Sequence, residues 1–326
     1  MEKINWGIIG CGDVTEVKSG PAFNKVNDSS LVAVMRRDGV RAKDYALRHH
    51  VPKWYDDASL LINDPDVNAI YIATPPSSHE AYTIAAIDAG KPVYVEKPMT
   101  INYATALSMH QYADGKNVKL SVAHYRRAQP LFKKIQQLLA EKAIGDIRYV
   151  KLECHKMPYT ADELLQPKTA WRLDPAISGG GLFHDLAPHQ LDLMIHFFGQ
   201  VEKVNGVASS QPGPGNVQDL VAGNILFKNG IVFNGTWFFN ALAGEERDRC
   251  EIFGSSGKIS FSVFEVLPVI LTTGNKTESF SFDLLPHVQQ PMIEKVVEYF
   301  LDKSSNPCSA NDGAEVMRLI DAFSGT

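Results

Sequence analysis

Short apolar runs alternate with longer amphipathic segments along the first third of the chain. One apolar run begins at Ile4, and four more follow at residues 31–35, 68–73, 92–95 and 119–123. Residues 41–49 have helical character, and residues 77–89 form a predicted helix that Gly90 ends. Strands that alternate with helices in this way predict a parallel, doubly wound sheet of the α/β class.

The second part of the chain has a different pattern. After a helix predicted for residues 130–141, the sequence favours many short strands, at residues 147–155, 207–209, 220–227, 231–239, 249–253 and 258–264. Asn229-Gly230 is a strong hairpin signal and Ser256-Gly257 marks a second turn, so this sheet is mostly antiparallel. The proline- and glycine-rich residues 211–215 form a loop, and two helices close the chain, at about residues 291–301 and 311–323.

We therefore predict two domains. Residues 1–123 form a Rossmann domain, and residues 124–326 form an α+β domain with a mostly antiparallel sheet. The length of 326 residues supports this division, because a single hydrophobic core rarely grows beyond about 250–300 residues.

Composition and charge exclude several classes of protein. The net charge of -5 provides no basic surface for nucleic acid, and no apolar run reaches the roughly 18 residues of a membrane span. The chain starts with a strand directly after Met1-Glu2-Lys3, without a secretory signal. The four cysteines are far apart and suit a reducing compartment, with no disulfide framework. We expect a cytoplasmic protein.

The stretch at residues 8–15, Ile-Ile-Gly-Cys-Gly-Asp-Val-Thr, follows the first apolar run. Gly10 and Gly12 let the chain turn sharply and approach a phosphate, and Asp13 and Val14 begin a helix whose N-terminus favours negative charge. These four residues are predicted to hold a dinucleotide pyrophosphate, with a simple tight turn as the alternative. The final threonine departs from the pattern, because Gly or Ala is usual there.

Arg36, Arg37 and Asp38 follow the second predicted strand, about 20 residues past the glycines, where a side chain meets the adenosine ribose. An acidic residue there accepts from the 2′-hydroxyl of NAD, whereas arginines can pair with the 2′-phosphate of NADP. Asp38 comes late for the first role. The arginines therefore favour NADP, and solvated side chains at a strand end are the alternative.

The next two strands also end in polar residues. Thr74 and Pro75 stop the first, because proline cannot donate to a sheet ladder, and the second delivers Lys97. Ligands of doubly wound sheets bind beyond the carboxyl ends of the strands. The glycine turn, Arg36, Thr74 and Lys97 are therefore predicted to lie at one sheet edge.

A second candidate site follows Gly179-Gly180-Gly181, on a helix predicted to end at Gly199. Asp185 and His189 are four residues apart and share one helix face, where the carboxylate could orient the imidazole for general base chemistry. Asp192 and His196 continue the stripe. A surface ion pair or a metal site are the alternatives, but no Cys or His cluster elsewhere clearly supplies further ligands, and we expect no metal.

At these residues the chain resembles the Gfo/Idh/MocA family of glucose–fructose oxidoreductase, inositol dehydrogenase and MocA, over essentially its whole length. Glu96-Lys97-Pro98 matches one family signature, and the triple glycine with Asp185 and His189 matches a second in order and spacing. Further stretches are similar to family stretches: residues 73–76 with His79, Tyr125-Arg126-Arg127, Trp171-Arg172 and residues 287–290.

The resemblance implies Lys97, Asp185 and His189 as the catalytic set. His189 would be the base in oxidation and the acid in reduction, and Lys97 would stabilise charge on the reacting oxygen. The cofactor contacts implied beyond the glycine turn and the arginines are Thr74, Pro75, His79, Glu96, Lys97, Trp171 and Arg172. Substrate contacts are suggested for Tyr125, Arg127, His155 and His287, each of which is as easily a packed or surface residue.

The resemblance implies an NAD(P)-dependent oxidoreductase acting on a sugar, polyol or sugar derivative, with an open-faced sheet in the second domain. The cofactor is NADP or NAD, with NADP favoured. Relatives cover the open sheet face by pairing, so a homodimer or homotetramer is expected. Two alternatives are a redox-neutral, NAD-dependent glycosidase of similar fold and a non-catalytic sensor that regulates transcription. The three catalytic residues together argue against the sensor.

Overall fold

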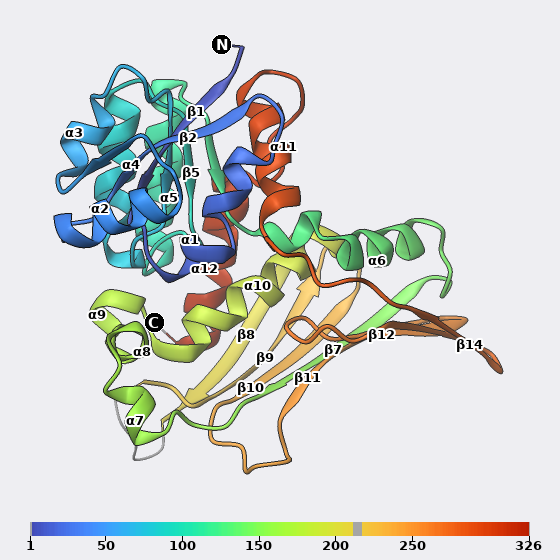
Figure 1. The fold of residues 1–326 in the computed structure, drawn as a ribbon. Coiled ribbons are helices and arrows are strands. Elements are labelled where there is room, and N and C mark those ends of the chain that lie inside the picture. The colour runs from blue at the N-terminus through green and yellow to red at the C-terminus, as the bar shows by residue number, and fades with distance from the viewer. Residues whose placement is uncertain (1, 211–216, 326) are drawn as a thin grey trace. The chain divides into compact units, whose positions relative to one another are not determined.

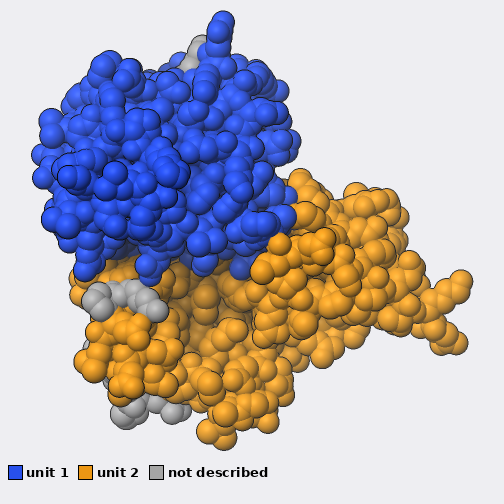
Figure 2. Space-filling view, viewed as in Figure 1, with its two compact units in different colours: residues 1–129, 285–317 blue, residues 130–284, 318–326 orange. Residues whose placement is uncertain are grey.

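The structure is a computed structural model that describes residues 2–210 and 217–325. The loop predicted at residues 211–215 lies outside the described residues. The chain divides into two compact units, each built from two separate stretches (Figures 1 and 2). Unit 1 comprises residues 1–129 and 285–317, and unit 2 comprises residues 130–284 and 318–326.

The single boundary predicted after residue 123 does not account for the late stretch 285–317, which belongs to unit 1. This stretch completes the edge of the first sheet, where Cys308 O accepts from Val122 N at 3.0 Å and Asn306 Nδ2 donates to Leu120 O at 2.8 Å. One boundary in the sequence cannot describe this division, because the chain returns to unit 1 after it has formed most of unit 2.

Unit 1 contains a six-stranded parallel sheet, as the alternating pattern predicts. The strand order is β3-β2-β1-β4-β5-β6, so the chain moves outward from β1 in both directions. Ligands of such sheets bind where the strand order reverses, beyond the ends of β1 and β4. The strands are β1 (Ile4–Ile9), β2 (Ser29–Met35), β3 (Lys53–Tyr55), β4 (Ala69–Ile72), β5 (Val93–Val95) and β6 (Leu120–Val122).

The helices of unit 1 begin at residues suited to capping. Asp38, Asp57 and Asn102 each accept a backbone N–H of the first turn that follows. The helices are α1 (Asp13–Val17), α2 (Gly39–Arg48), α3 (Ala58–Ile62), α4 (His79–Asp88), α5 (Tyr103–Lys116), α11 (Gln290–Phe300) and the first part of α12 (Ala310–Ser324), with 3-10 turns η1 (Gly20–Asn24), η2 (Pro76–Ser78) and η3 (Tyr125–Ala128).

Aromatic side chains fill the core of unit 1. The ring of Trp6 is fully buried and lies 4.9 Å from the ring of Phe23, which in turn lies 5.2 Å from Tyr71. Tyr71 and Tyr94, on the adjacent strands β4 and β5, stack at 5.3 Å. Two of these aromatic residues carry hydroxyl groups into the interior, and one of those hydroxyls reaches the candidate site.

Some elements were missed because their apolar signal is weak. Strand β3 is short and carries Trp54 with 41% of its surface exposed, so this tryptophan does not fill the core as its size suggests. The hairpin β13–β14 continues the second sheet beyond the last predicted strand, and β14 is almost wholly exposed. Exposed strands lack the alternation on which pattern reading depends.

Unit 2 contains an eight-stranded sheet with the order β14-β13-β12-β11-β7-β10-β9-β8. Every neighbouring pair is antiparallel except β7 and β10, which run parallel, so the predicted mostly antiparallel sheet is confirmed. The strands are β7 (Ile147–His155), β8 (Val201–Ser209), β9 (Leu220–Phe227), β10 (Val232–Phe238), β11 (Arg247–Gly254), β12 (Gly257–Phe261), β13 (Val269–Thr273) and β14 (Lys276–Phe280).

The longer helices of unit 2 lie on one face of this sheet, and the short helices pack against one another and against the longest helix (Figure 1). The helices of this unit are α6 (Pro130–Ala140), α7 (Ala161–Leu164), α8 (Pro167–Ala170), α9 (Pro175–Ser178) and α10 (Gly181–Phe198), with the turn η4 (Trp171–Leu173) and the end of α12. The ring of Phe323 in α12 lies directly over the sheet. A Cβ at Gly223 would come within 2.2 Å of that ring, so only glycine permits this approach.

The opposite face of the sheet is open. Side chains on β7 alternate between buried and partly exposed, so Lys151, Glu153 and His155 share the open face while Leu152 and Cys154 face the helices. Val207 is 72% exposed on the open face of β8. Among the described residues, no helix is both long and apolar enough to cross a membrane.

Candidate active site

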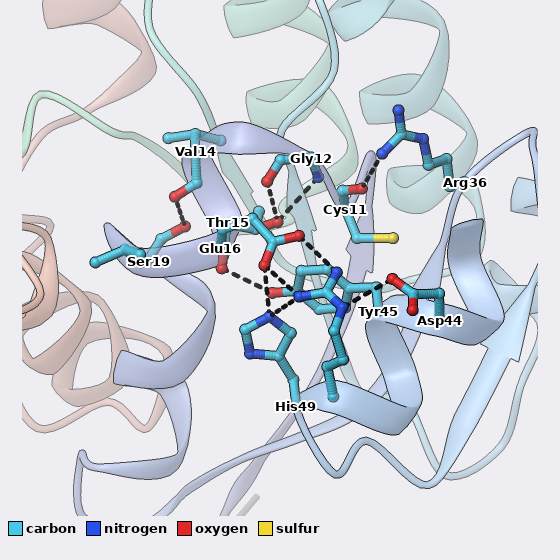
Figure 3. A network of polar contacts seen from close by, with 12 residues as sticks. Cys11, Gly12, Val14, Thr15, Glu16, Ser19, Arg36, Asp44, Tyr45 and His49 are labelled. Atoms are coloured by element: carbon cyan, nitrogen blue, oxygen red, sulfur yellow. Dashed lines mark hydrogen bonds and ion pairs between the residues drawn. The ribbon is translucent and has the colours of Figure 1, made fainter.

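The glycine turn lies at the end of β1 (Figure 3). Gly10 has a φ of +94°, and a Cβ there would lie 2.9 Å from the backbone of both Ala73 and Thr74, so no side chain fits. A Cβ at Gly12 would meet only Gly10 O, at 3.9 Å. At Gly10 the turn is therefore packed against the end of β4, whereas at Gly12 there is open space. A backbone that receives a phosphate requires such space.

Thr15, which departs from the expected pattern, has a definite local role. Its side chain is buried, and its hydroxyl accepts the N–H of Gly12 at 3.0 Å and lies 2.8 Å from Gly12 O. This is a capping arrangement at the start of α1. The glycine that allows close packing here is Gly20, because a Cβ at that position would lie 2.2 Å from both Thr15 O and the hydroxyl of Tyr45.

A polar network ties α1 to the end of α2 (Figure 3). Arg48 donates to both carboxylate oxygens of Glu16 at 2.8 Å, and this bond lowers the pKa of Glu16 to about 2. The His49 ring stacks on Tyr45 at 4.1 Å, and the Tyr45 hydroxyl donates to Thr15 O at 2.7 Å. Residues of α2 thus hold α1, the helix that follows the glycine turn, in place.

The three residues after β2 have different surroundings. Arg36 Nη1 donates to Cys11 O at 3.2 Å, so this guanidinium lies against the glycine turn, and Arg37 is exposed. Asp38 accepts the N–H of Arg41 and caps α2. The Asp38 side chain is thus used as the N-cap of α2. Burial raises the pKa of the Cys11 thiol to about 11, which suits a packing residue.

His79 was expected to contact the cofactor, but its ring is fully buried between two loops. Nε2 lies 2.7 Å from Thr74 O, and Nδ1 lies 3.1 Å from the carbonyl oxygens of Pro98 and Met99. Burial lowers the pKa of His79. The ring braces the loops that follow β4 and β5. We therefore assign His79 an indirect role at this edge, and Thr74 and Pro75 remain partly exposed there.

The Glu96-Lys97-Pro98 stretch follows β5 directly. Lys97 is partly exposed at the carboxyl edge of the sheet, and the Lys97–Pro98 peptide bond is cis. Glu96 is buried, and its carboxylate accepts from the Tyr71 hydroxyl at 2.5 Å and from Gln289 Nε2 at 2.6 Å. Glu96 was predicted as a cofactor contact, and the structure instead turns its side chain inward.

Three residues suggested as substrate contacts support the frame of unit 1. Tyr125 and Arg127 are buried, and Arg127 pairs with Asp312 at 3.2 Å. Although burial favours the neutral carboxyl, the charge of Arg127 helps to hold the pKa of Asp312 below its usual value. His287 Nδ1 lies 2.6 Å from Val17 O, at the end of α1.

The second candidate site lies on α10 in unit 2. The helix begins at a glycine turn in which a Cβ at Gly180 would lie 2.3 Å from the His184 ring, so the glycines admit that ring. Burial lowers the pKa of His184 to about 4. Asp185 is partly exposed and His189 is buried, on the helical spacing that the sequence predicts. Pro188 lies inside the helix.

Asp185 pairs with Arg172, which comes from the turn η4. Arg172 Nε donates to Asp185 Oδ2 at 3.0 Å, and the guanidinium lies 4.7 Å from the centre of the Trp171 ring. The three predicted site residues 171, 172 and 185 therefore form one cluster. Electrostatic attraction and stacking hold the guanidinium plane beside the carboxylate.

The His189 ring meets Phe264 edge to face, with the ring centres 5.8 Å apart. Asp248 on β11 holds the loop that carries this phenyl ring. Its buried carboxylate accepts the backbone N–H groups of Val263 at 3.1 Å, Phe264 at 2.5 Å and Glu265 at 2.8 Å. Sequence reasoning missed Asp248, because its partners lie more than ten residues away and follow no motif.

Two further residues named in the sequence analysis, His155 and Asp192, can be located in the structure. His155 lies on the open face of the sheet, opposite the face on which α10 packs, and its ring meets Phe238 at 6.0 Å. The structure therefore does not bring it to His189. Asp192 is buried within α10. No group of three His, Cys, Asp or Glu side chains is arranged to hold a metal ion in residues 2–210 and 217–325.

Comparison with known proteins identifies both halves of the chain. Residues 4–124 match the family model described as "Oxidoreductase family, NAD-binding Rossmann fold", and residues 132–260 match the "GFO/IDH/MocA C-terminal domain". Oxidoreductase P35 of Formosa agariphila is 48% identical over 99% of both chains. The trans-1,2-dihydrobenzene-1,2-diol dehydrogenase of Bos taurus is 32% identical over 70% of this chain and 66% of its own.

The fold also has solved counterparts. A levoglucosan dehydrogenase in complex with NADH and levoglucosan superimposes with a TM-score of 0.89 over 98% of this chain and 96% of its own, at 22% identity. That identity establishes a shared fold alone. The two family models and the 48% identical relative lead to one conclusion: the chain is an NAD(P)-binding oxidoreductase that belongs to the Gfo/Idh/MocA family.

Proposed function

We propose that the protein transfers hydride between a nicotinamide cofactor and a CH–OH carbon of a sugar, polyol or sugar derivative. The observation that carries this proposal is the carboxyl edge of the first sheet, where the open glycine turn at Gly12 and the partly exposed Lys97 both lie. The similar proteins named as a dihydrodiol dehydrogenase and a levoglucosan dehydrogenase support the substrate class.

The residues at this edge fit a dinucleotide. The N–H of Gly12 is taken by Thr15, and the first N–H groups of a helix lack an intrahelical acceptor, so those of Asp13 and Val14 are the ones proposed to meet the pyrophosphate. Arg36 and Arg37 would pair with a 2′-phosphate, which favours NADP over NAD. When bound, the nicotinamide supplies the hydride acceptor or donor.

The residues of the chain supply proton transfer and charge stabilisation. His189 takes the hydroxyl proton during oxidation and returns it during reduction, and the ammonium of Lys97 stabilises negative charge on the reacting oxygen. Asp185 would orient the imidazole or bind a neighbouring substrate hydroxyl. The ion pair with Arg172 at 3.0 Å restricts the position of the Asp185 carboxylate, which supports a role in orientation.

The open sheet face would bind a second copy of the chain. It carries Val207 at 72% exposure and Val232 at 40%, beside a row of hydrogen-bonded asparagines at positions 205, 224 and 234. Covering such a face removes apolar surface from water. The proposed homodimer or homotetramer is tested by light scattering of the wild type and of Val207→Arg, which is expected to dissociate.

The experiment that tests the proposed function is a fluorescence titration with NADPH and NADH, followed by a screen of sugars and polyols with the better coenzyme. Binding of either coenzyme with turnover of a polyol supports the proposal. Absence of binding would favour a sensor. Coenzyme that is retained through purification, together with cleavage of a glycoside, would favour the redox-neutral glycosidase.

A further inference from the structure

The buried carboxylate of Glu96 collects three hydrogen bonds in the interior of unit 1. The Tyr71 hydroxyl and Gln289 Nε2 donate to Oε1, at 2.5 and 2.6 Å, and the backbone N–H of Lys97 donates to Oε2 at 3.1 Å. The three donors come from β4, from the residue before α11 and from the loop after β5. A carboxylate deprived of such donors in the interior carries a large desolvation cost, so these partners fix its position.

The bond to the Lys97 N–H connects this arrangement to the lysine that is proposed to act in the reaction. It joins a side chain to the backbone of the very next residue, and it therefore sets the plane of the peptide from which the Lys97 side chain projects. Glu96 N also donates to Ile72 O at 2.9 Å, which holds the same loop to the end of β4. We therefore expect a shift of the Glu96 carboxylate to change the direction of Lys97.

Gln289 links this carboxylate to the helix that follows the glycine turn. Its own N–H donates to Lys18 O at 3.1 Å, while its side chain reaches Glu96. Tyr71 makes a parallel link, because its hydroxyl also lies 3.2 Å from that of Ser19, which in turn donates to Val14 O at 3.3 Å. The two donors to Glu96 are thus both anchored beside α1.

Packing alone does not explain an amide at position 289. Gln289 is fully buried, and its Oε1 has no hydrogen-bond partner in the described parts of the chain. An unsatisfied buried carbonyl destabilises the folded chain, and an apolar side chain of the same size would avoid this cost. The reverse amide orientation would place Oε1 against the carboxylate, so the NH₂ must face Glu96.

We propose that Gln289 is a positioning residue for Lys97: through Glu96, and together with Tyr71, it fixes the lysine relative to the glycine turn. The inference rests on the proposed role of Lys97. It assigns a task in the reaction to a residue 192 positions away in sequence (289 − 97) that does not itself touch the reacting atoms.

The test compares Gln289→Met with Gln129→Met. Gln129 holds the same segment through a bond from Nε2 to Val288 O at 3.1 Å, but it does not contact Glu96, so it reports the effect of loosening the segment alone. We expect Gln289→Met to lower kcat roughly 10- to 100-fold at saturating coenzyme. The coenzyme dissociation constant should stay within about threefold of wild type, and Gln129→Met should retain wild-type kcat.

A second variant gives a pH signature that a purely structural role would not produce. In Gln289→Glu two carboxyl groups face each other and share a proton only at lower pH. Its kcat relative to wild type should therefore rise as the pH falls, whereas the deficit of Gln289→Met should not depend on pH. Tyr71→Phe combined with Gln289→Met should cost less than the sum of the two, because both act through one carboxylate.

Hydrogen exchange at the Lys97 amide provides a readout without substrate. Exchange there should accelerate in Gln289→Met and not in Gln129→Met, with the amides of Val93–Val95 unchanged in both. Wild-type kcat and wild-type exchange in Gln289→Met would overturn the inference. An active Lys97→Ala would instead remove the proposed function of the lysine and leave the exchange result standing. If Gln289→Met does not fold, Tyr71→Phe and Gln289→Glu decide the question.

Discussion

The two candidate catalytic regions are built in different ways. In unit 1, Lys97 lies on a loop after β5, beside Glu96, whose carboxylate accepts hydrogen bonds from Tyr71 and Gln289, both distant in sequence. In unit 2, Asp185 and His189 lie four residues apart on the single helix α10, so helical geometry alone sets their separation. The loop needs a buried polar network to define its direction, and the helix does not.

This difference determines what disturbs each region. A helix face tolerates the loss of one neighbour, because backbone hydrogen bonds hold its residues in place. A loop held by one buried carboxylate loses its geometry when a donor to that carboxylate is removed. Substitutions far from Lys97 are therefore expected to reach the chemistry in unit 1, whereas in unit 2 the sensitive positions lie on the helix and its direct contacts.

The largest effect is expected on the loop side of the comparison. Lys97→Ala removes the ammonium that is proposed to stabilise charge on the reacting oxygen, and turnover should fall at least roughly 100- to 1000-fold. Coenzyme binding, measured by fluorescence, should stay close to wild type. Lys91→Ala is the control, since Lys91 bonds to Asp64 O away from the edge. An active Lys97→Ala would remove the lysine from the mechanism.

On the helix side, His189→Asn removes the proposed acid and base. Turnover should fall roughly 100-fold or more at neutral pH, the range typical of general acid–base catalysis. The control is His155→Asn, on the opposite face of the sheet, which should keep full activity. Equal losses of turnover in the two variants would contradict a specific role for His189 on α10.

The coenzyme comparison gives a smaller effect. Replacing Arg36 and Arg37 together by alanine should weaken NADPH binding by about 10- to 100-fold and NADH binding far less, because only NADPH carries a 2′-phosphate. Titration of both coenzymes measures this directly. Arg41→Ala, which removes the partner of the capping Asp38, is the matched control. Equal losses for NADPH and NADH would contradict the proposed preference.

The last effect concerns stability rather than activity and belongs to unit 2. Burial lowers the pKa of His184 to about 4 from an unfolded value near 6.5, so the unfolded chain binds this proton first as the pH falls. The free energy of unfolding should therefore decrease between about pH 6.5 and pH 4, by a few kcal/mol at most. Denaturant titrations of His184→Gln and wild type should show a shallower decrease for the variant. Parallel curves would show that His184 titrates normally.

Much of the fold was predictable because its signals are local. Glycine turns, proline stops and apolar alternation predict the doubly wound sheet and most of the second sheet. The spacing alone predicts that Asp185 and His189 share one helix face, whereas their catalytic role is implied by the family resemblance. The return of residues 285–317 to unit 1 was not predictable, because no local pattern reports which sheet a late segment joins.

The same distinction holds at the site. The inward direction of Glu96 and the bracing role of His79 depend on residues that meet only in the folded chain. The resemblance marked both residues as part of the site, but spacing could not tell a buried brace from a ligand contact. Gln289 and Asp248 carried even less signal, since each acts on a loop through hydrogen bonds of long sequence separation.

The most direct test of the central claim is to follow the hydride itself. NADPH that carries deuterium at C4 of the nicotinamide, or NADH if it binds more tightly, is incubated with the enzyme and the ketone form of the best sugar or polyol. The account predicts that deuterium from one face of the ring appears on the new carbinol carbon and that Lys97→Ala suppresses this transfer. Product that forms without deuterium, or coenzyme that is bound and never oxidised, would contradict it.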